Sequence, residues 1–270
     1  FCMINAPFNH GDTKNNVFRN WSPENIIKKF DFFAENNIKN IKIADEMFVF
    51  KKQHYVELCK LIHERKYDFN IWAYARIDTV REQHLEVLKN AGVNWLALGI
   101  ESANQVIRQE VTKGKFQETN IRNIINKISE HNISSLGNYI FGLPKDNMET
   151  MTETLALSLE LETDYANFYC AMAYPGSQLH RDFSKENPKA LPENNDAGWI
   201  GYSQHAYETF NLPTDNLSNT EILKFRDEAF IKYFTDRPYV TRMAKKFGTG
   251  FQKEIDKMLS MKLKRKLYDK

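Results

Sequence analysis

The chain has 270 residues, of which 42% are hydrophobic and 13% aromatic, and its formal net charge is +2. This apolar content can fill one large core, which excludes a wholly disordered chain. The near balance of acidic and basic residues excludes a general attraction to nucleic acid or acidic lipid. The sequence has neither a run of about 20 apolar residues nor a start that resembles a signal peptide, so we expect a soluble cytoplasmic protein.

Amphipathic helices and short apolar strands alternate from residue 22 onward. Ser22 and Pro23 are typical of a helix start, and they predict a first helix over 22–37. Further helices are expected around 55–62, over 81–92, across 103–131 with a break near 113–114, and from 144–146 through 159; strands are expected over 41–44, 71–75, 95–100, 134–142 and 165–173. The alternation favours parallel strands joined by helical crossovers. Because the series begins with a helix, we expect a strand to precede residue 1.

The sequence changes character after the last expected strand. Residues 177–217 are mixed and polar, and 184–199 are predicted to be a linker. Ser218 and Glu221 have the spacing of a capping box and predict a helix through Tyr233. For the basic stretch 245–270 a solvated helix face is the simpler interpretation, and a phosphate-rich partner is the alternative. Trp199 and Tyr202 are either substrate-side aromatic residues or packing residues.

The cysteines do not form a self-sufficient metal motif. Cys2, Cys59 and Cys170 are odd in number and too widely spaced for a disulfide scaffold. Cys59 lies on the apolar stripe of an expected helix, and Cys170 lies within an expected strand. Both are therefore predicted to be inert packing residues.

Polar residues follow the expected strands at the ends where a parallel barrel gathers its active-site groups. Asp45 and Glu46 follow one strand, Arg76 the next, and Glu101 and Ser102 the third. Such a set suits a ligand with an ammonium group, a carboxylate and sugar hydroxyls. Structural alternatives remain open: the two acids can precede a helix N-terminus, and Arg76 can pair with Asp78 or Glu101. An ordinary barrel hydrolase or lyase with Glu101 or Glu46 as base is a further alternative.

Several of these stretches resemble successive strand-end motifs of radical S-adenosylmethionine (SAM) proteins. The similarity is carried, in order and spacing, by IADEMF at 43–48, YARIDTV at 74–80, LGIES at 98–102, IFGLPKD at 140–146 and YPGS at 174–177. It is strongest to the group that often has a cobalamin-binding domain upstream, and it covers residues 1–180. The resemblance implies a partial (β/α)6 TIM-like barrel of parallel strands whose first strand is missing, followed by a mostly helical C-terminal extension at 181–270.

The resemblance also implies site residues. Phe1 and Cys2 look like the end of the family's CxxxCxxC loop, so that Cys2 would be one ligand of a [4Fe–4S] cluster. Residues implied near SAM are Asp45 and Glu46 at its amino group, Arg76 at its carboxylate, Glu101 with Ser102 at the ribose, and Ile140 with Gly142 beside the adenine. Asn138 and Lys145 depart from the family's GxIxGxxE pattern. A cluster needs three thiolates, so the chain as given is expected to be inactive, either truncated at its start or degenerate.

The implied activity is reductive cleavage of SAM to a 5′-deoxyadenosyl radical that modifies a substrate, with methylation as an outcome if a cobalamin domain precedes the chain. The expected partners are a small-molecule substrate and an external electron donor such as flavodoxin or ferredoxin. Neither a membrane nor a nucleic acid is expected as a partner. The alternative is a degenerate, non-catalytic barrel that binds a ligand or a partner.

Overall fold

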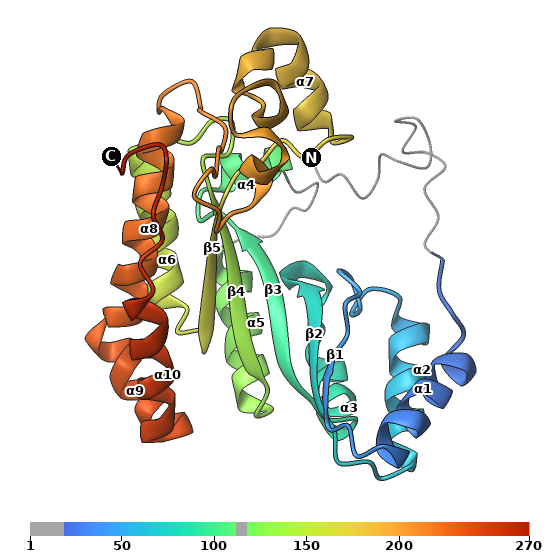
Figure 1. Cartoon of the computed structure of the whole chain (residues 1–270). Coiled ribbons are helices and arrows are strands. Elements are labelled where there is room, and N and C mark those ends of the chain that lie inside the picture. Colours follow the sequence, from blue (N-terminus) through green and yellow to red (C-terminus); the bar gives the residue numbers. More distant parts are fainter. Residues whose placement is uncertain (1–18, 112–117, 270) are drawn as a thin grey trace.

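The fold is built on one parallel sheet. In the computed structural model, which describes residues 19–111 and 118–269, five strands lie side by side in chain order: β1 (Asn40–Lys42), β2 (Asn70–Arg76), β3 (Val93–Glu101), β4 (Ser134–Phe141) and β5 (Tyr165–Cys170). Every neighbouring pair is parallel. The sheet curls into a half-barrel (Figure 1). The predicted partial TIM-like barrel is confirmed.

Helices cover the outer side of the half-barrel. These are α1 (Pro23–Glu35), α2 (Lys52–Glu64), α3 (Leu85–Asn90), α5 (Glu118–Glu130) and α6 (Met148–Glu160), with the short α4 (Gln105–Val111) above the end of β3 (Figure 1). In β2, the buried Ile71, Ala73 and Ala75 face the helices, while half-buried side chains alternate with them. We call the side that carries the alternate set, such as Trp72 and Tyr74, the concave face of the sheet.

The local sequence signals explain most element boundaries. Pro23 is the first residue of α1, as predicted. The predicted start of α6 at Pro144 or Asp146 is early, because Asn147 caps this helix in a capping box with Thr150. The Asp146 carboxylate instead accepts hydrogen bonds from Leu143 N (2.9 Å) and Thr150 Oγ1 (2.7 Å), which closes the turn before the helix. β5 ends at Cys170, short of the predicted residue 173. The predicted helix break near 113–114 lies outside the described residues.

The C-terminal extension shares its core with the barrel. Its helices are α8 (Asn219–Thr235), α9 (Arg237–Phe247) and α10 (Thr249–Ser260). The capping box of Ser218 and Glu221 opens α8, as predicted. Tyr233 on α8 packs edge-on against Phe168 of β5 at 5.7 Å, and its hydroxyl donates to Thr163 O at 2.9 Å. α8 therefore seals the helix-facing side of the last strand.

The predicted linker is folded. Residues 177–217 contain α7 (Gln178–Glu186) and three short 3-10 helices, Pro188–Ala190, Pro192–Asn194 and Gly198–Tyr202. Leu191 is buried with Leu179 and Ala173 in a small apolar cluster. The few apolar residues of a polar stretch thus suffice to pack it above the barrel, where Figure 1 shows it.

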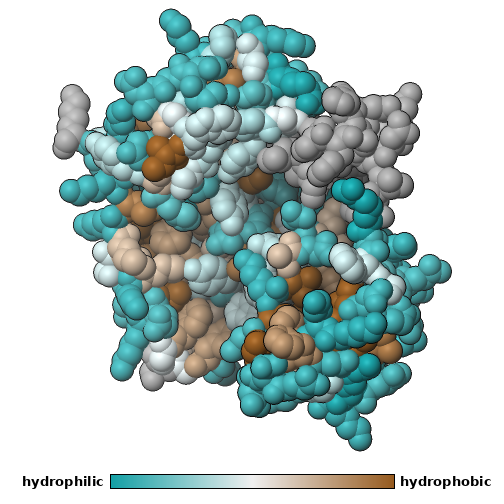
Figure 2. All heavy atoms as spheres, turned by 45° about the vertical axis from the view of Figure 1, so that its right-hand side comes forward, coloured by the Kyte–Doolittle hydropathy of each residue, from teal (hydrophilic) through white to brown (hydrophobic). Residues whose placement is uncertain are grey.

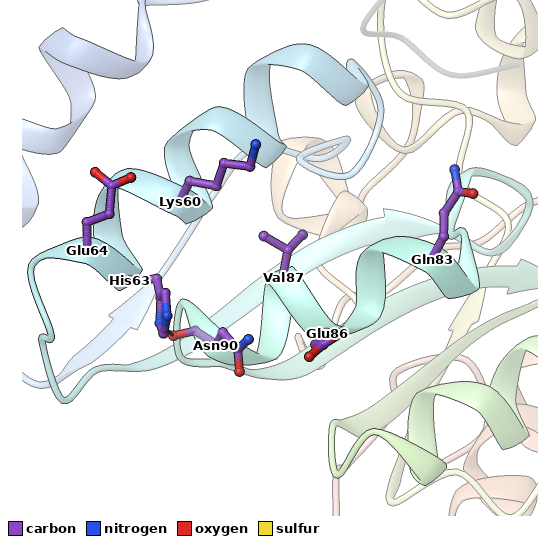
Figure 3. Close-up of a pocket in the computed structure, with 7 residues that line it drawn as sticks. All are labelled: Lys60, His63, Glu64, Gln83, Glu86, Val87 and Asn90. Atoms are coloured by element: carbon purple, nitrogen blue, oxygen red, sulfur yellow. Dashed lines mark hydrogen bonds between the residues drawn. The ribbon is translucent and has the colours of Figure 1, made fainter.

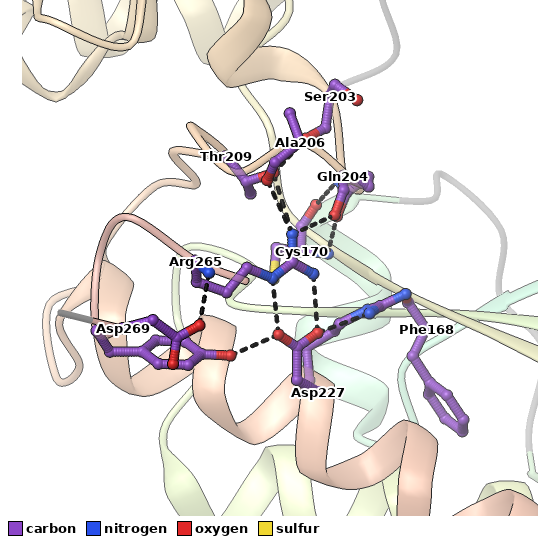
Figure 4. Close-up of polar contacts among 11 residues, drawn as sticks. Phe168, Cys170, Ser203, Gln204, Ala206, Thr209, Asp227, Arg265 and Asp269 are labelled. Atoms are coloured by element: carbon purple, nitrogen blue, oxygen red, sulfur yellow. Dashed lines mark hydrogen bonds and ion pairs between the residues drawn. The ribbon is translucent and has the colours of Figure 1, made fainter. Parts of the chain in front are cut away.

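The basic tail is only partly a solvated helix. After α10 the chain turns back along α8, and the Arg265 side chain is completely buried. Arg265 Nε and Nη2 donate to the Asp227 carboxylate at 2.8 and 2.9 Å, and Arg265 Nη1 donates to Gln204 O at 2.9 Å (Figure 4). The prediction of a solvated face is wrong at this residue, because the guanidinium is buried in an ion pair with Asp227 of α8. None of the described helices is both long and apolar enough to cross a membrane.

Candidate functional site

The strand-end residues lie at the C-terminal ends of the parallel strands, which together form one end of the half-barrel. Arg76 ends β2 and Glu101 ends β3, and the pairing register places Arg76 beside Gly99, Gly99 beside Asn138, and Asn138 beside Asn167. These four positions form one row across four strands of the concave face, and we refer to them as the polar row. Sequence analysis predicted a contribution from Arg76, but it did not connect the two asparagines.

Glu101 lies in a tight turn at the end of β3. Its φ angle is +69°, in the left-handed region, and Ser102 N donates to Ile100 O at 3.0 Å across it. The β3–β4 register shifts between Gly99 and Glu101, as in a bulge. The Glu101 side chain turns back along the strand, so that its Oε1 is 2.8 Å from where a Cβ on Gly99 would lie. The carboxyl thereby fills the place that Gly99 leaves empty in the polar row.

The surroundings of Glu101 change its acidity. Burial raises the pKa of the Glu101 carboxyl to about 7, while the positive charge of Arg76 acts in the opposite direction. The side chain keeps some exposure to solvent, but its carboxyl is largely surrounded by protein. An additional positive charge at this edge would favour the ionised form.

Arg76 already holds a carboxylate. Its Nε and Nη2 donate to the two Asp78 oxygens at 2.9 and 2.5 Å, in a bidentate pair that remains partly exposed. The structural alternative of an Arg76–Asp78 pair is therefore confirmed. The same geometry shows that the guanidinium can present its fork to a carboxylate at this edge, and a ligand carboxylate would compete with Asp78 for it.

Asp45 and Glu46 are exposed in the turn after β1. The neighbouring Phe48 and Val49 are buried and anchor this turn to the barrel. Within the described ranges no hydrogen bond or ion pair joins the two acids to Arg76 or Glu101. The alternative that they serve the next helix is not supported, because α2 begins at Lys52 without an acidic residue in its first turn. Contact with an amino group of a ligand stays a prediction.

Ser102 is explained by contacts within the protein. It is completely buried, its hydroxyl lies 3.2 Å from Thr154 Oγ1, and Asn104 N donates to that hydroxyl at 3.2 Å. Arg108 Nη1 donates to the Ser102 carbonyl at 2.8 Å. These bonds fasten the loop after Glu101 to α6. A direct ligand contact by Ser102 stays a prediction.

Gly142 and Ile140 lie at the end of β4. Gly142 has φ +75°, and the place of a side chain is taken by Ile222 of α8, 2.7 Å from where a Cβ would lie. On that side the close approach is therefore to α8, and not to a flat base. Ile140 is half-buried against a small cluster that contains Ile107 and Leu143. Contact of either residue with adenine stays a prediction.

The concave face carries further groups that sequence analysis missed. Asn138 Nδ2 donates to Leu98 O at 3.2 Å, and Asn167 Nδ2 donates to Asn138 Oδ1 at 3.1 Å. Strand alternation places these side chains on the concave face, but a single sequence does not reveal that they pair. Toward the opposite edge the face becomes apolar around an open hollow of about 460 Å³ lined by Trp72 and Trp95. Figure 2 shows hydrophobic residues gathered in and beside hollowed parts of the molecular surface.

Two of the three cysteines are packing residues, as predicted. Cys59 and Cys170 are buried, and burial raises the pKa of each thiol to about 12. Both are packing residues of the core between the sheet and the helices, which confirms the prediction. Cys2 lies outside the described residues. In the part of the chain that the structure describes, no three His, Cys, Asp or Glu side chains gather in a way that could hold a metal ion.

Two other surfaces stand apart from the polar row. Tyr202 is buried, stacks on Tyr174 at 5.6 Å and donates a short hydrogen bond to Glu193, so it is a packing residue, whereas Trp199 is 71% exposed.

A polar hollow of about 210 Å³ lies between α2 and α3 (Figure 3). His63 Nδ1 is 3.1 Å from Asn90 O there. This hollow is on the helical layer, away from the strand ends.

The family follows from a comparison with known proteins. The model of the radical SAM superfamily matches residues 1–158, which contain β1 to β4 and the predicted site residues from Asp45 to Gly142. The chain belongs to the radical SAM superfamily. The resemblance deduced from the strand-end motifs is thereby confirmed for these residues.

Two curated relatives match most of the chain. It is 28% identical over 226 residues to an uncharacterised methyltransferase of Pyrococcus horikoshii, covering 83% of this chain and 47% of that protein. It is 23% identical over 259 residues to the anaerobic magnesium-protoporphyrin IX monomethyl ester cyclase of Rubrivivax gelatinosus, covering 88% of this chain and 44% of that protein. The chain thus spans about half the length of these relatives.

The fold is shared with a solved radical SAM methyltransferase. The structure of TsrM from Kitasatospora setae, with cobalamin and a [4Fe–4S] cluster bound, has a TM-score of 0.57 and 14% identity to this chain. The matched part covers 61% of this chain and 34% of TsrM. At this level of identity the similarity shows a common fold.

Proposed function

We propose that this chain is the SAM-binding core of a radical SAM enzyme that modifies a small-molecule substrate. The observation that carries the proposal is the placement of Arg76 and Glu101 on neighbouring strands, at one edge of a half-barrel that belongs to this superfamily. When bound, a reduced [4Fe–4S] cluster supplies the electron that cleaves SAM to methionine and a 5′-deoxyadenosyl radical. Methyl transfer is the outcome that the name of the Pyrococcus relative favours.

The residues of the strand-end edge fit such a ligand. The Arg76 guanidinium can receive the methionyl carboxylate in place of Asp78, as its bidentate geometry with that residue indicates. Glu101 can accept hydrogen bonds from ribose hydroxyls, and the positive sulfonium would favour its ionised form. Asp45 and Glu46 are exposed acids for the amino group. Cys2 would be the cluster ligand supplied by this chain, together with two further thiolates.

The decisive experiment is anaerobic reconstitution of the full-length protein with iron and sulfide, followed by measurement of 5′-deoxyadenosine formed from SAM with dithionite or reduced flavodoxin. We expect a reductant-dependent product that Cys2→Ala abolishes. Cys59→Ala and Cys170→Ala serve as matched controls, because their buried thiols on the helical layer should leave cluster absorbance unchanged.

A full-length protein that binds SAM but forms no cluster would favour the degenerate, ligand-binding barrel instead. A reaction that proceeds in air without iron would favour a hydrolase or lyase with Glu101 or Glu46 as base. Either result would contradict the proposed function.

A further inference from the structure

Gly99 has no structural reason of its own to be glycine. It lies inside β3, its backbone is not in the left-handed region, and the row of strand-end residues continues through it from Arg76 to Asn138. Glycine weakens the interior of a strand because it has no side chain to pack. A specific neighbour must therefore account for it.

The only described atoms near the missing side chain belong to Glu101. A Cβ on Gly99 would lie 2.8 Å from Glu101 Oε1 and 3.9 Å from Glu101 Cδ, and apart from the adjacent Leu98 and Ile100 no other atom of the described residues would lie within 4 Å. The other strand and loop glycines differ. A Cβ on Gly137 would meet the ring of Tyr139, and one on Gly92 would meet the backbone oxygen of Phe69 at 2.5 Å. At Gly99 alone among these three, the opposing group is the end of a flexible acidic side chain at the candidate site.

We propose that Gly99 is a positioning residue, whose missing side chain leaves the space on the concave face in which the Glu101 carboxylate lies between Arg76 and Asn138. This inference rests on the proposed function, in which Glu101 binds the SAM ribose. The bulge at the end of β3 turns Glu101 back toward the sheet, and the gap at Gly99 lets its carboxyl lie flat in the polar row. A methyl group at residue 99 would push the carboxylate away from the row and out toward solvent.

Because the displaced atoms are at the end of a flexible side chain, Gly99→Ala should fold normally. The test is a double-mutant cycle on the anaerobically reconstituted full-length protein, with the SAM dissociation constant measured by titration calorimetry. We expect Gly99→Ala to weaken SAM binding by about tenfold, the usual effect of losing a hydrogen bond to a charged group. In a Glu101→Ala background the same substitution should change the dissociation constant by less than about twofold, because no carboxylate remains to be displaced.

Equal weakening in both backgrounds, or no weakening by Gly99→Ala, would overturn the positioning role. A second measurement needs no SAM. The pH dependence of unfolding, compared with that of Glu101→Ala, reports the pKa of Glu101 in this chain. We expect Gly99→Ala to lower that pKa from about 7 toward the ordinary value of 4.5 as the carboxyl becomes exposed. A wild-type protein that does not bind SAM would refute the proposed function, while an unchanged pKa in Gly99→Ala would refute the role of Gly99.

Discussion

At the scale of single residues, the candidate site contains an acidic side chain, Glu101, whose ionisation is unfavourable in the folded protein. Glu101 has a left-handed backbone and a carboxyl whose pKa burial raises to about 7, and the Arg76 guanidinium acts against that shift. Sites that bind ligands often keep such groups, since the ligand provides the missing compensation. The stability of the ligand-free protein should therefore decrease as the pH rises from about 4.5 to about 7.

Glu101→Gln tests directly how much stability the folded protein loses through the Glu101 carboxyl as the pH rises. A carboxyl with a raised pKa is protonated in both the folded and unfolded chains below about pH 4.5, and the folded chain resists its ionisation as the pH rises to about 7. The free energy of unfolding that depends on Glu101 should thus decrease across this window by about 1–3 kcal/mol. Glu101→Gln should remove the decrease, so that the variant is more stable than the wild type at pH 8 and similar at pH 4.5.

Urea unfolding at the two pH values measures the difference, with Glu46→Gln as the control. Glu46 is exposed, so this variant should follow the wild-type pH dependence. If Glu101→Gln and Glu46→Gln behaved alike at pH 8, the carboxyl of Glu101 would not be desolvated in the folded protein.

At the scale of the elements, a glycine at the end of β4 allows α8 of the C-terminal extension to pack closely against it. Gly142 combines φ +75° with Ile222 Cγ2 2.7 Å from where a Cβ would lie. Gly142→Ala should therefore destabilise the protein by about 2–4 kcal/mol, from the left-handed backbone and from overpacking against α8. Gly250→Ala is the matched control: Gly250 is in α10, has open space around it, and should tolerate alanine with no loss of stability.

Thermal or urea unfolding of both variants decides the matter. A Gly142→Ala protein as stable as Gly250→Ala would mean that α8 can move away from β4, so that the contact with Ile222 does not require glycine at this position.

The elements also show how far sequence reasoning reaches. Hydrophobic alternation located all five strands, and Ser218 with Glu221 fixed the start of α8, because these signals are local. The position of Arg76 at a strand end was predictable for the same reason. The pairing of Asn138 with Asn167 and the contact between Gly142 and Ile222 depend on register and on helix docking, which involve residues far apart in the chain. No local pattern encodes them.

At the scale of the whole molecule, the C-terminal tail is connected to the open edge of the sheet. The Gln204 side chain bonds to both Cys170 N (3.0 Å) and Cys170 O (2.9 Å), as a neighbouring strand would. Arg265 from the tail donates to the Gln204 carbonyl and pairs with Asp227 on α8 (Figure 4). The tail, α8 and the segment that contains Gln204 therefore together support the C-terminal end of β5.

The Asp227 carboxylate is the centre of this arrangement. Burial would raise its pKa, but hydrogen bonds from Arg265, Tyr268 and Arg226 outweigh burial and lower it. Arg265→Ala leaves the half-buried Asp227 carboxylate with two of its three partners, Arg226 and Tyr268, and removes a completely buried guanidinium. We expect a loss of about 2–4 kcal/mol in the free energy of unfolding, because the Asp227 carboxylate loses its bidentate charged partner and the space of the buried guanidinium is left unfilled. The exposed neighbour Lys264 provides the control, and Lys264→Ala should change stability by less than about 0.5 kcal/mol.

Limited proteolysis alongside urea unfolding separates a local from a global effect of Arg265→Ala. If the tail supports the edge of β5, cleavage should accelerate both in residues 261–269 and in the segment around Gln204, because the Arg265 guanidinium joins the tail to Asp227 on α8 and to the carbonyls of Gln204 and Ala206. Faster cleavage in the tail alone would mean that Gln204 holds β5 without help. A variant as stable and as resistant as Lys264→Ala would mean that the tail is not anchored to α8 in solution.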